Sequence, residues 1–383
     1  MKLILFLSSG ISRPSGLLGV HELTTDVLNG EWFYHTDGRF YPGAPGAAQV
    51  NDPTEILQKF LSLLAPSADR CHPLDGQKGN YEDLYFLAEQ IADNARGQVD
   101  NPAIHPFVSQ LKEQVSTLTN QPLGQIADLA CSFIRSVVAQ RLASPPQIQG
   151  LDLIESLARS RDFERVDIVT LNHDVLIEDF LHQKEIPFVD GFTGPDGNVR
   201  YFDPDLFESA TKVRLFKLHG SINWYRFRLE HGNPFSDRFG IIAGIDAQEA
   251  PDSQGTLTNQ IDVLPWIIAG THAKAVQYSF GIHADMHFWF HRLLREHNAM
   301  AMSGYGWSDR VINGRLMEWL HSGIQPRLIL MHKHPGELAQ FSKSKLWDRY
   351  QPLVKAGRII PIPKWMQDVG TEEVRKHLIS TPA

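Results

Sequence analysis

The sequence predicts an α/β protein with a mostly parallel sheet flanked by helices and an all-helical subdomain inserted into it. Three observations predict this fold. An apolar run starts almost at the first residue, as in a strand that is buried on both faces. About a hundred residues of purely helical periodicity follow. After residue 160, short apolar runs alternate with helical patterns, which is typical of βαβ units.

The composition of the chain excludes several classes of protein. The chain has 383 residues, 42% hydrophobic and 21% charged, which excludes wholesale disorder, collagen-like repeats and coiled coil. The 36 basic and 44 acidic residues give a net charge of −8. Because attraction to phosphate needs a basic footprint, we predict no direct nucleic-acid contact. No stretch approaches the ~18 apolar residues of a membrane span, so we predict no membrane association.

The N-terminal segment is the first strand and the loop that follows it. Residues 3–7 form an apolar run of five, shorter than the ~7–15 residues of a signal peptide core. The loop begins Ser8-Ser9-Gly10-Ile11-Ser12, and small residues let the backbone approach a ligand closely. The only cysteines are Cys71 and Cys131, which indicates reduced thiols and a cytoplasmic location.

Residues 51–150 are predicted to form the helical insertion, and residues 1–50 and 151–383 the α/β domain. Asp52-Pro53-Thr54 is typical of a helix start. Apolar residues at helical spacing over 56–64 and 126–138 predict faces that pack inside the insertion or between protomers. Pro145-Pro146 marks the exit of this segment. Residues 30–50 and 226–262 are interpreted as loops.

The second half of the chain supplies the remaining strands and helices of a Rossmann-like sheet. The strands are predicted at residues 166–171, 213–218, 264–269, 299–303, 327–331 and 358–362. The helices between them are predicted at residues 175–182, 284–297, 310–321 and 343–355. Ligands of such sheets bind at the carboxyl ends of the strands, so the residues that follow each strand are the candidates for function.

Small, polar or ionisable residues follow four of the strands. They are Ser9, Gly10, Ile11 and Ser12; Asn172, His173 and Asp174; His219 and Gly220; and Gly304, Ser308 and Asp309. Backbone N–H groups of residues 10–12 are predicted to bind phosphate at the start of a helix. The Asn172 amide can donate and accept hydrogen bonds, and a histidine such as His219 suits proton transfer near neutral pH.

In this order the motifs resemble the sirtuin-like family of NAD-consuming proteins. Ser8-Ser9-Gly10-Ile11-Ser12 resembles its glycine-rich loop, Leu171-Asn172-His173-Asp174 its threonine-asparagine-x-aspartate motif, and Leu218-His219-Gly220 its histidine-glycine strand end. Gly304-Tyr305-Gly306-Trp307-Ser308-Asp309 resembles its late turn. The chain lacks the four zinc cysteines of the deacetylating members, so it is most similar to the zinc-free bacterial branch of NAD hydrolases.

The resemblance implies a function. It implies hydrolysis of the nicotinamide–ribose bond of NAD without zinc, by an NAD-depleting effector of bacterial antiphage defence. Asn172 and His219 would be catalytic. The residues implied in cofactor binding are Ser9, Gly10, Ile11, Ser12, Asp174, Gly220, Gly304, Ser308 and Asp309. A homo-oligomer is implied, with a partner ATPase or another activating protein as a further option.

Two other function classes remain open at the level of the sequence. One is a non-catalytic module that binds NAD or ADP-ribose, and the other is an ADP-ribosyltransferase or deacylase with a protein acceptor. His283, His287 and His291 share one helix face, but three ligands on one straight helix lie too far apart for tetrahedral zinc. We interpret that face as packed or interfacial.

Overall fold

A computed structural model describes residues 1–29, 33–36, 39–43, 52–70, 72, 78–99, 101–143, 145–229, 232–233, 236–242, 249–251, 257–270, 274–340, 342 and 346–379. The chain forms two compact units. The first comprises Met1–Leu17, Pro145–Asp262 and Ala275–Ala383, and the second comprises Leu18–Ser144 and Val263–Lys274. The second unit thus begins at Leu18, whereas the sequence pattern places the start of the insertion at residue 51. It also includes the later segment Val263–Lys274.

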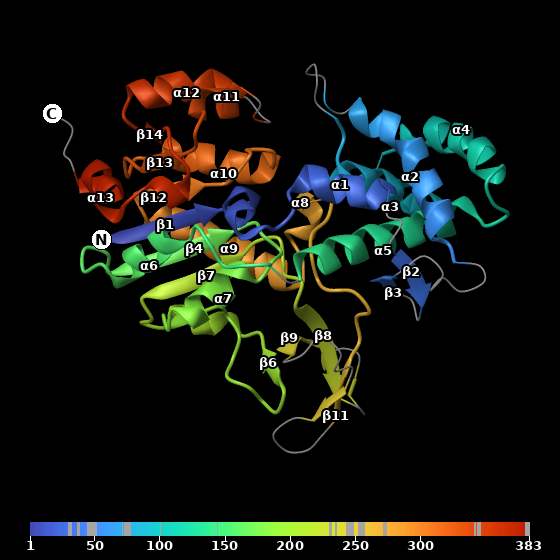
Figure 1. The fold of residues 1–383 in the computed structure, drawn as a ribbon, viewed down its shortest axis with the longest axis horizontal. Coiled ribbons are helices and arrows are strands. Elements are labelled where there is room, and N and C mark those ends of the chain that lie inside the picture. The colour runs from blue at the N-terminus through green and yellow to red at the C-terminus, as the bar shows by residue number, and fades with distance from the viewer. Residues whose placement is uncertain are drawn as a thin grey trace. The chain divides into compact units, whose positions relative to one another are not determined.

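The first unit is built on a seven-stranded sheet (Figure 1). Its strand order is β14 (Ile359–Ile362), β13 (Arg327–Met331), β12 (Ala299–Ser303), β1 (Lys2–Leu7), β4 (Arg165–Thr170), β7 (Val213–Lys217) and β5 (Phe188–Val189). Every neighbouring pair is parallel. The predicted α/β class with a mostly parallel sheet is therefore confirmed. The short β5 is an addition, because two residues carry no periodic signal.

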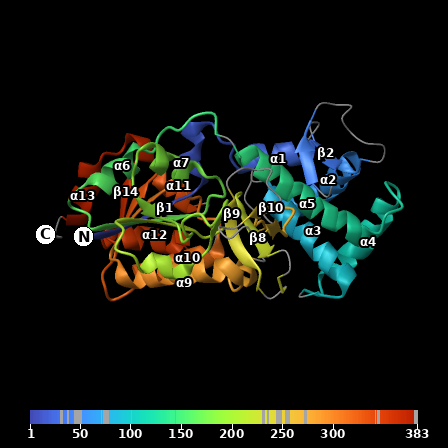
Figure 2. The same ribbon diagram turned by 90° about the horizontal axis from the view of Figure 1, so that it is seen from below.

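Helices cover both faces of this sheet. Figure 2 shows α6 (Asp152–Arg159) and α7 (Leu176–Gln183) on one side, and α9 (Gly281–Glu296) and α10 (Arg310–Leu320) on the other. The remaining helices of its C-terminal part are α11 (Pro335–Gln340), α12 (Leu346–Lys355) and α13 (Thr371–Ile379). Because both faces are covered, all five residues of the first apolar run, 3–7, are fully buried.

One charged cluster lies inside this core. Asp167 of β4 accepts a hydrogen bond from Arg214 Nε of β7 at 2.6 Å, and its other oxygen lies 2.8 Å from His297 Nε2. Burial alone would raise the pKa of the Asp167 carboxyl, but hydrogen bonds from His297 and Arg214 outweigh it and lower the pKa. The carboxylate is therefore held as an anion between two partners.

A second, antiparallel sheet belongs to the same unit, and the sequence does not predict it. Its order is β10 (Glu249–Pro251), β11 (Leu257–Gln260), β8 (Trp224–Leu229), β9 (Arg238–Ile242) and β6 (Val199–Tyr201). The loop expected over 226–262 is thus wrong for the described residues. Val199, Tyr201, Phe227 and Ile242 form a small core between these strands. The strands are short and half-polar, so their alternation is too brief to stand out.

The predicted strand at residues 264–269 is also wrong. This segment does not join the seven-stranded sheet and belongs to the second unit. There, Arg135 of α5 (Leu123–Leu142) donates a hydrogen bond from Nη2 to the carbonyl of Pro265 at 2.6 Å. A short apolar run is equally consistent with a strand or with a buried connection, so its length alone could not decide.

The second unit is mainly helical. Beside α5 it contains α1 (Val20–Asn29), α2 (Thr54–Asp69), α3 (Tyr81–Arg96), α4 (Ile104–Ser116) and a hairpin of β2 (Phe33–Thr36) and β3 (Arg39–Pro42). Phe133 of α5 packs edge-on against Phe33 and Phe40 of the hairpin. These aromatic contacts explain why the unit starts before residue 51, in a segment interpreted as loop. The apolar faces of α2 and α5 are buried within the unit, as at Phe60, Leu64 and Ile134.

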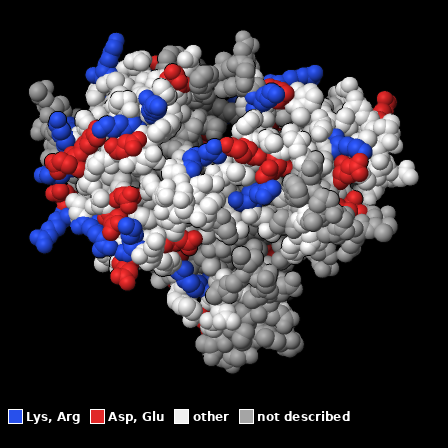
Figure 3. Space-filling view, viewed as in Figure 1, with Lys and Arg blue, Asp and Glu red and all other residues white. Residues whose placement is uncertain are grey.

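Three further observations concern membrane spans, cysteines and surface charge. Among the described residues, no helix is long and apolar enough to cross a membrane. Cys131 is a free thiol, and Cys71 lies outside the described residues. On the face drawn in Figure 3, basic side chains are interspersed with acidic ones. Some of the charged side chains form ion pairs, such as Lys184–Glu155 at 2.8 Å.

Candidate functional site

The site is organised around the point at which the strand order of the sheet reverses. From β1 the chain continues to β4 on one side, whereas β12 pairs with β1 on the other side. The loops after β1 and β12 lie at the carboxyl ends of these two adjacent strands, where ligands of such sheets bind. A cavity of about 410 Å³ lies here, lined among others by Gly10, Ile11, Ser303 and Trp365.

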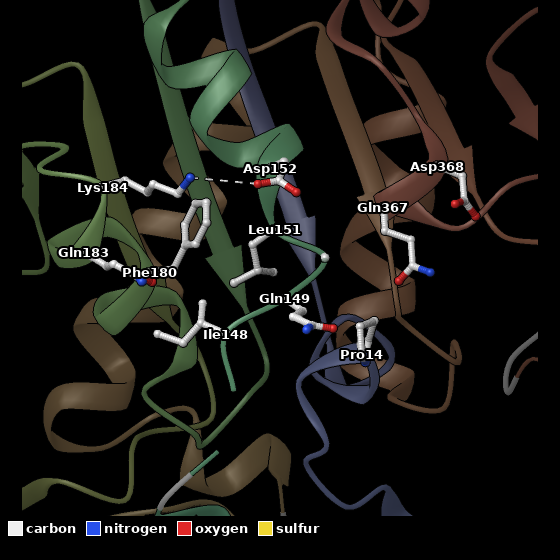
Figure 4. A pocket seen from close by; sticks show the side chains of 11 residues that line it. Pro14, Ile148, Gln149, Leu151, Asp152, Phe180, Gln183, Lys184, Gln367 and Asp368 are labelled. Atoms are coloured by element: carbon white, nitrogen blue, oxygen red, sulfur yellow. Dashed lines mark ion pairs between the residues drawn. The ribbon is translucent and has the colours of Figure 1, made fainter. Parts of the chain in front are cut away.

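A neighbouring cavity of about 720 Å³ shares Pro14, Gly150 and Gln367 with the first (Figure 4). It is lined by amides and apolar side chains as well as by Lys184, which lies 4.0 Å from Asp152. Together the two cavities extend along the loop after β1 as far as the start of α6.

Gly10 and Gly304 bring the two loops into backbone contact. The Gly10 N–H donates to the Gly304 carbonyl at 3.1 Å, and a Cβ on Gly10 would lie 2.6 Å from Gly304 Cα. Gly304 has φ of +73°, and a Cβ there would meet the Ser8 carbonyl at 2.5 Å. Glycine is therefore required at both positions by the packing of one loop on the other.

The same contact bears on the predicted phosphate site. Residues Ser9–Ser15 form a short 3₁₀ helix, η1, and not the α-helix expected there. The Gly10 amide donates to Gly304 and the Ile11 amide donates to the Ser8 carbonyl at 3.0 Å. Two of the three amides predicted to bind phosphate thus already have partners within the chain. Ser9 is exposed beside them, and Ser12 is buried.

Three polar residues meet where β1 and β4 end. Asn172 Nδ2 donates to Ser12 Oγ at 2.9 Å, and Ser12 Oγ donates to Asp174 Oδ2 at 3.1 Å. The other Asp174 oxygen accepts from the Leu176 amide at 3.1 Å and so begins α7. Asn172 Oδ1 is buried and has no hydrogen-bond partner among the described residues. An unpaired carbonyl in such a place is costly and marks a position that suits a ligand or water.

The electrostatics around Asp174 are set by burial and by one cation. Burial raises the pKa of the Asp174 carboxyl and also that of Glu178, and the ammonium group of Lys217 opposes both shifts. Lys217 Nζ contacts Glu178 Oε1 at 2.8 Å and donates to the Asp174 carbonyl. The end of β7 is thereby tied to the start of α7.

A second cluster forms where β7 and β12 end. His219 Nε2 lies 2.7 Å from the Tyr278 hydroxyl and 3.4 Å from Asp309 Oδ2. The Tyr278 hydroxyl in turn donates to Asp309 Oδ2. Asp309 Oδ1 accepts from the amides of Val311 and Ile312, so Asp309 is the N-cap of α10. Ser308, predicted to share this role, is exposed.

Two of the helix histidines pack against this cluster. His287 stacks on Tyr278 with ring centroids 3.7 Å apart, and His283 faces Trp224 at 6.4 Å. Burial, together with repulsion from His219 when that ring is protonated, lowers the pKa of His283 and of His287 to about 3. Both are therefore neutral at physiological pH. His291 is exposed, and no group of three His, Cys, Asp or Glu in the described part of the chain is placed to hold a metal ion.

The structure thus gathers five of the eleven predicted site residues into two buried clusters at one edge of the sheet. Ser12, Asn172 and Asp174 form one, and His219 and Asp309 belong to the other. Gly220 is buried in the turn after β7, with φ of +81°. Sequence reasoning missed Tyr278, because a single tyrosine outside any recognisable pattern carries no motif.

Comparison with known proteins finds similarity among solved structures only. No family model and no curated protein matches the chain. A solved Sir2 homologue mutant in complex with ADP-ribose is 12% identical, with a TM-score of 0.30, over 100% of this chain and 95% of that one. A Sir2 homologue in complex with NAD is 12% identical, with a TM-score of 0.32, over 93% and 88%. At these values neither likeness decides the fold or the activity of this chain.

Proposed function

We propose that this protein hydrolyses NAD at the nicotinamide–ribose bond and releases nicotinamide and ADP-ribose. The observation that carries the proposal is the Asn172 carboxamide. It is buried at the switch-point edge, its Nδ2 is held by Ser12, and its Oδ1 has no partner among the described residues. A fixed acceptor at this edge of a parallel sheet suits the positioning of a water molecule or a ribose hydroxyl.

Asn172 and His219 have separate roles in the proposed reaction. Asn172 orients the attacking water through Oδ1. As the bond between the anomeric carbon and the nicotinamide nitrogen breaks, its electron pair neutralises the pyridinium, and the water oxygen bonds to the oxocarbenium-like carbon. His219 accepts the proton that the water loses and passes it to solvent. No redox partner is needed, because NAD and water account for all the atoms of both products.

The remaining predicted residues are proposed to position the substrate. Ser9 and Ser308 are exposed, and Ser9 precedes Gly10, which lines the cavity of about 410 Å³. The hydroxyls of these two serines are the proposed contacts to the pyrophosphate. Asp174 holds Ser12 and, through it, Asn172. Gly304 allows the two loops to lie close together, because any side chain at this position would clash with the Ser8 carbonyl.

The biological role is proposed from the sequence motifs. Their resemblance to zinc-free bacterial NAD hydrolases supports an NAD-depleting effector of antiphage defence. The same resemblance supports a cytoplasmic homo-oligomer, with a partner ATPase or another activating protein. A toxic hydrolase has to be held inactive until it is needed, which such an assembly step would provide.

The test is incubation of the full chain with NAD at several protein concentrations, with chromatography of the products and measurement of particle size. Asn172→Ala and His219→Ala are expected to abolish turnover, with a loss of about 10²–10⁴-fold for the histidine. The exposed Asn298→Ala and His321→Ala are matched controls that keep full activity. Unchanged NAD loss in both site variants contradicts the residue assignment. A labelled acceptor protein instead of free ADP-ribose would indicate a transferase.

A further inference from the structure

Asp309, Tyr278 and His219 form a compact hydrogen-bonded cluster that includes the proposed base. Tyr278 is 5% exposed, His219 4% and Asp309 6%, so water does not compete for these contacts. Tyr278 contacts the other two through one oxygen atom, with Asp309 Oδ2 on one side and His219 Nε2 on the other. The order of the protons in this cluster follows from the number that each group can donate.

The assignment of the hydrogen positions in this cluster starts from the Asp309 carboxylate. Its Oδ1 accepts from two backbone amides at the start of α10, where the helix dipole favours a negative charge. An ionised carboxylate only accepts, so Oδ2 takes the proton of the Tyr278 hydroxyl. That hydroxyl has one proton, and its oxygen can then only accept from His219. The hydrogen must therefore sit on His219 Nε2, which also faces Asp309 Oδ2 at 3.4 Å.

We propose that Tyr278 and Asp309 are positioning residues that hold neutral His219 in the Nε2–H tautomer, so that Nδ1 is the atom that takes the proton from water. This rests on the proposed NAD hydrolysis. When His219 gains that proton, the ring carries a positive charge, and the nearby Asp309 carboxylate stabilises it. Tyr278 keeps its own proton throughout, and the carboxylate stays ionised.

His287 fixes the position of Tyr278. Its ring stacks on the tyrosine at 3.7 Å and 28°, and burial lowers its pKa to about 3, so the stacking ring is uncharged. Neither ring nitrogen of His287 has a hydrogen-bond partner among the described residues. His287 therefore acts through packing of its ring on the ring of Tyr278.

The direct test is ¹⁵N NMR of the full chain with labelled histidine, in which His219 is assigned by its loss in His219→Gln. The two ring nitrogens of a neutral imidazole differ in shift according to which one carries the proton. We expect Nε2–H in the wild type. In Asp309→Asn the amide donates to the tyrosine oxygen, the tyrosine proton turns to His219, and the tautomer changes to Nδ1–H. A wild-type Nδ1–H form, or an unchanged tautomer in Asp309→Asn, overturns the proposal.

Kinetics with NAD provide the second readout. Asp309→Asn is expected to lower kcat by about 10²–10⁴-fold with little change in KM, because the base presents the wrong nitrogen. Tyr278→Phe keeps the stacked ring and leaves His219 Nε2 near Asp309, so its loss is smaller. Tyr201→Phe, which removes another buried hydroxyl, and Asp203→Asn, another helix N-cap, are controls with wild-type kcat.

The two readouts separate the two proposals. A higher KM with unchanged kcat in Asp309→Asn would make Asp309 a substrate contact and overturn the positioning role. The NMR measurement needs no turnover, so it tests the proton order even if the chain does not hydrolyse NAD. Absence of turnover together with the predicted tautomer change would refute the proposed function only.

Discussion

Acid destabilises this protein through two buried neutral histidines. His283 and His287 have a folded-state pKa of about 3, below the ordinary value of 6.5. In the unfolded chain they bind protons as the pH falls through 6.5, and in the folded protein they do not. The unfolded state therefore binds more protons below this pH, and the free energy of unfolding falls as the pH falls from 6.5 toward 3.

The magnitude follows from linkage. Between about pH 7.5 and about pH 5.5, each such histidine reduces the free energy of unfolding by about 1.4 kcal/mol, and the pair by about 2.7 kcal/mol. His287→Phe keeps a ring against Tyr278 and removes the titrating group. It is expected to lose about 1.4 kcal/mol less stability than the wild type over this pH interval. His291→Phe, on the exposed face of α9, is the matched control and should behave as the wild type.

Urea unfolding followed by tryptophan fluorescence measures this difference, because six of the eight tryptophans belong to the unit that contains α9. The comparison is made between pH values for each variant, so a change in stability common to both pH values cancels. An equal loss of stability in His287→Phe and the wild type would refute the burial of a neutral imidazole against Tyr278.

Two further predictions concern packing and buried charge. Gly10→Ala is expected to lower the free energy of unfolding by about 1–3 kcal/mol, because the new Cβ would lie 2.6 Å from Gly304 Cα. Gly306→Ala, with open space around its Cβ, should have little effect on the melting temperature. Asp167→Asn should cost about 3–5 kcal/mol in urea unfolding, since it leaves the buried Arg214 guanidinium without its anion. Asp237→Asn, in a more exposed pair, should cost about 0–1 kcal/mol, and equal losses would contradict this reasoning.

The parallel sheet could be predicted from the sequence because its strands are buried on both faces. Residues 3–7 and 299–302 are continuous apolar runs, and small residues follow each of them, so a local window contains the whole signal. The antiparallel sheet around β8 and β9 could not be predicted in this way. Its strands are half-polar, and pairs such as Trp224 with Ile241 are set by a partner strand that no local window contains.

The same difference between local patterns and long-range contacts applies to the residues of the site. The residues that follow each strand can be read in the sequence, and the choice of Asn172, His219 and Asp309 as candidates comes from them. The folding of the chain brings Tyr278 into contact with both His219 and Asp309, packs Gly10 on Gly304, and gives two amides expected for phosphate other partners. The physical reason is that periodicity and turn chemistry are local, whereas hydrogen bonds between residues 59 and 31 positions apart depend on how the chain packs.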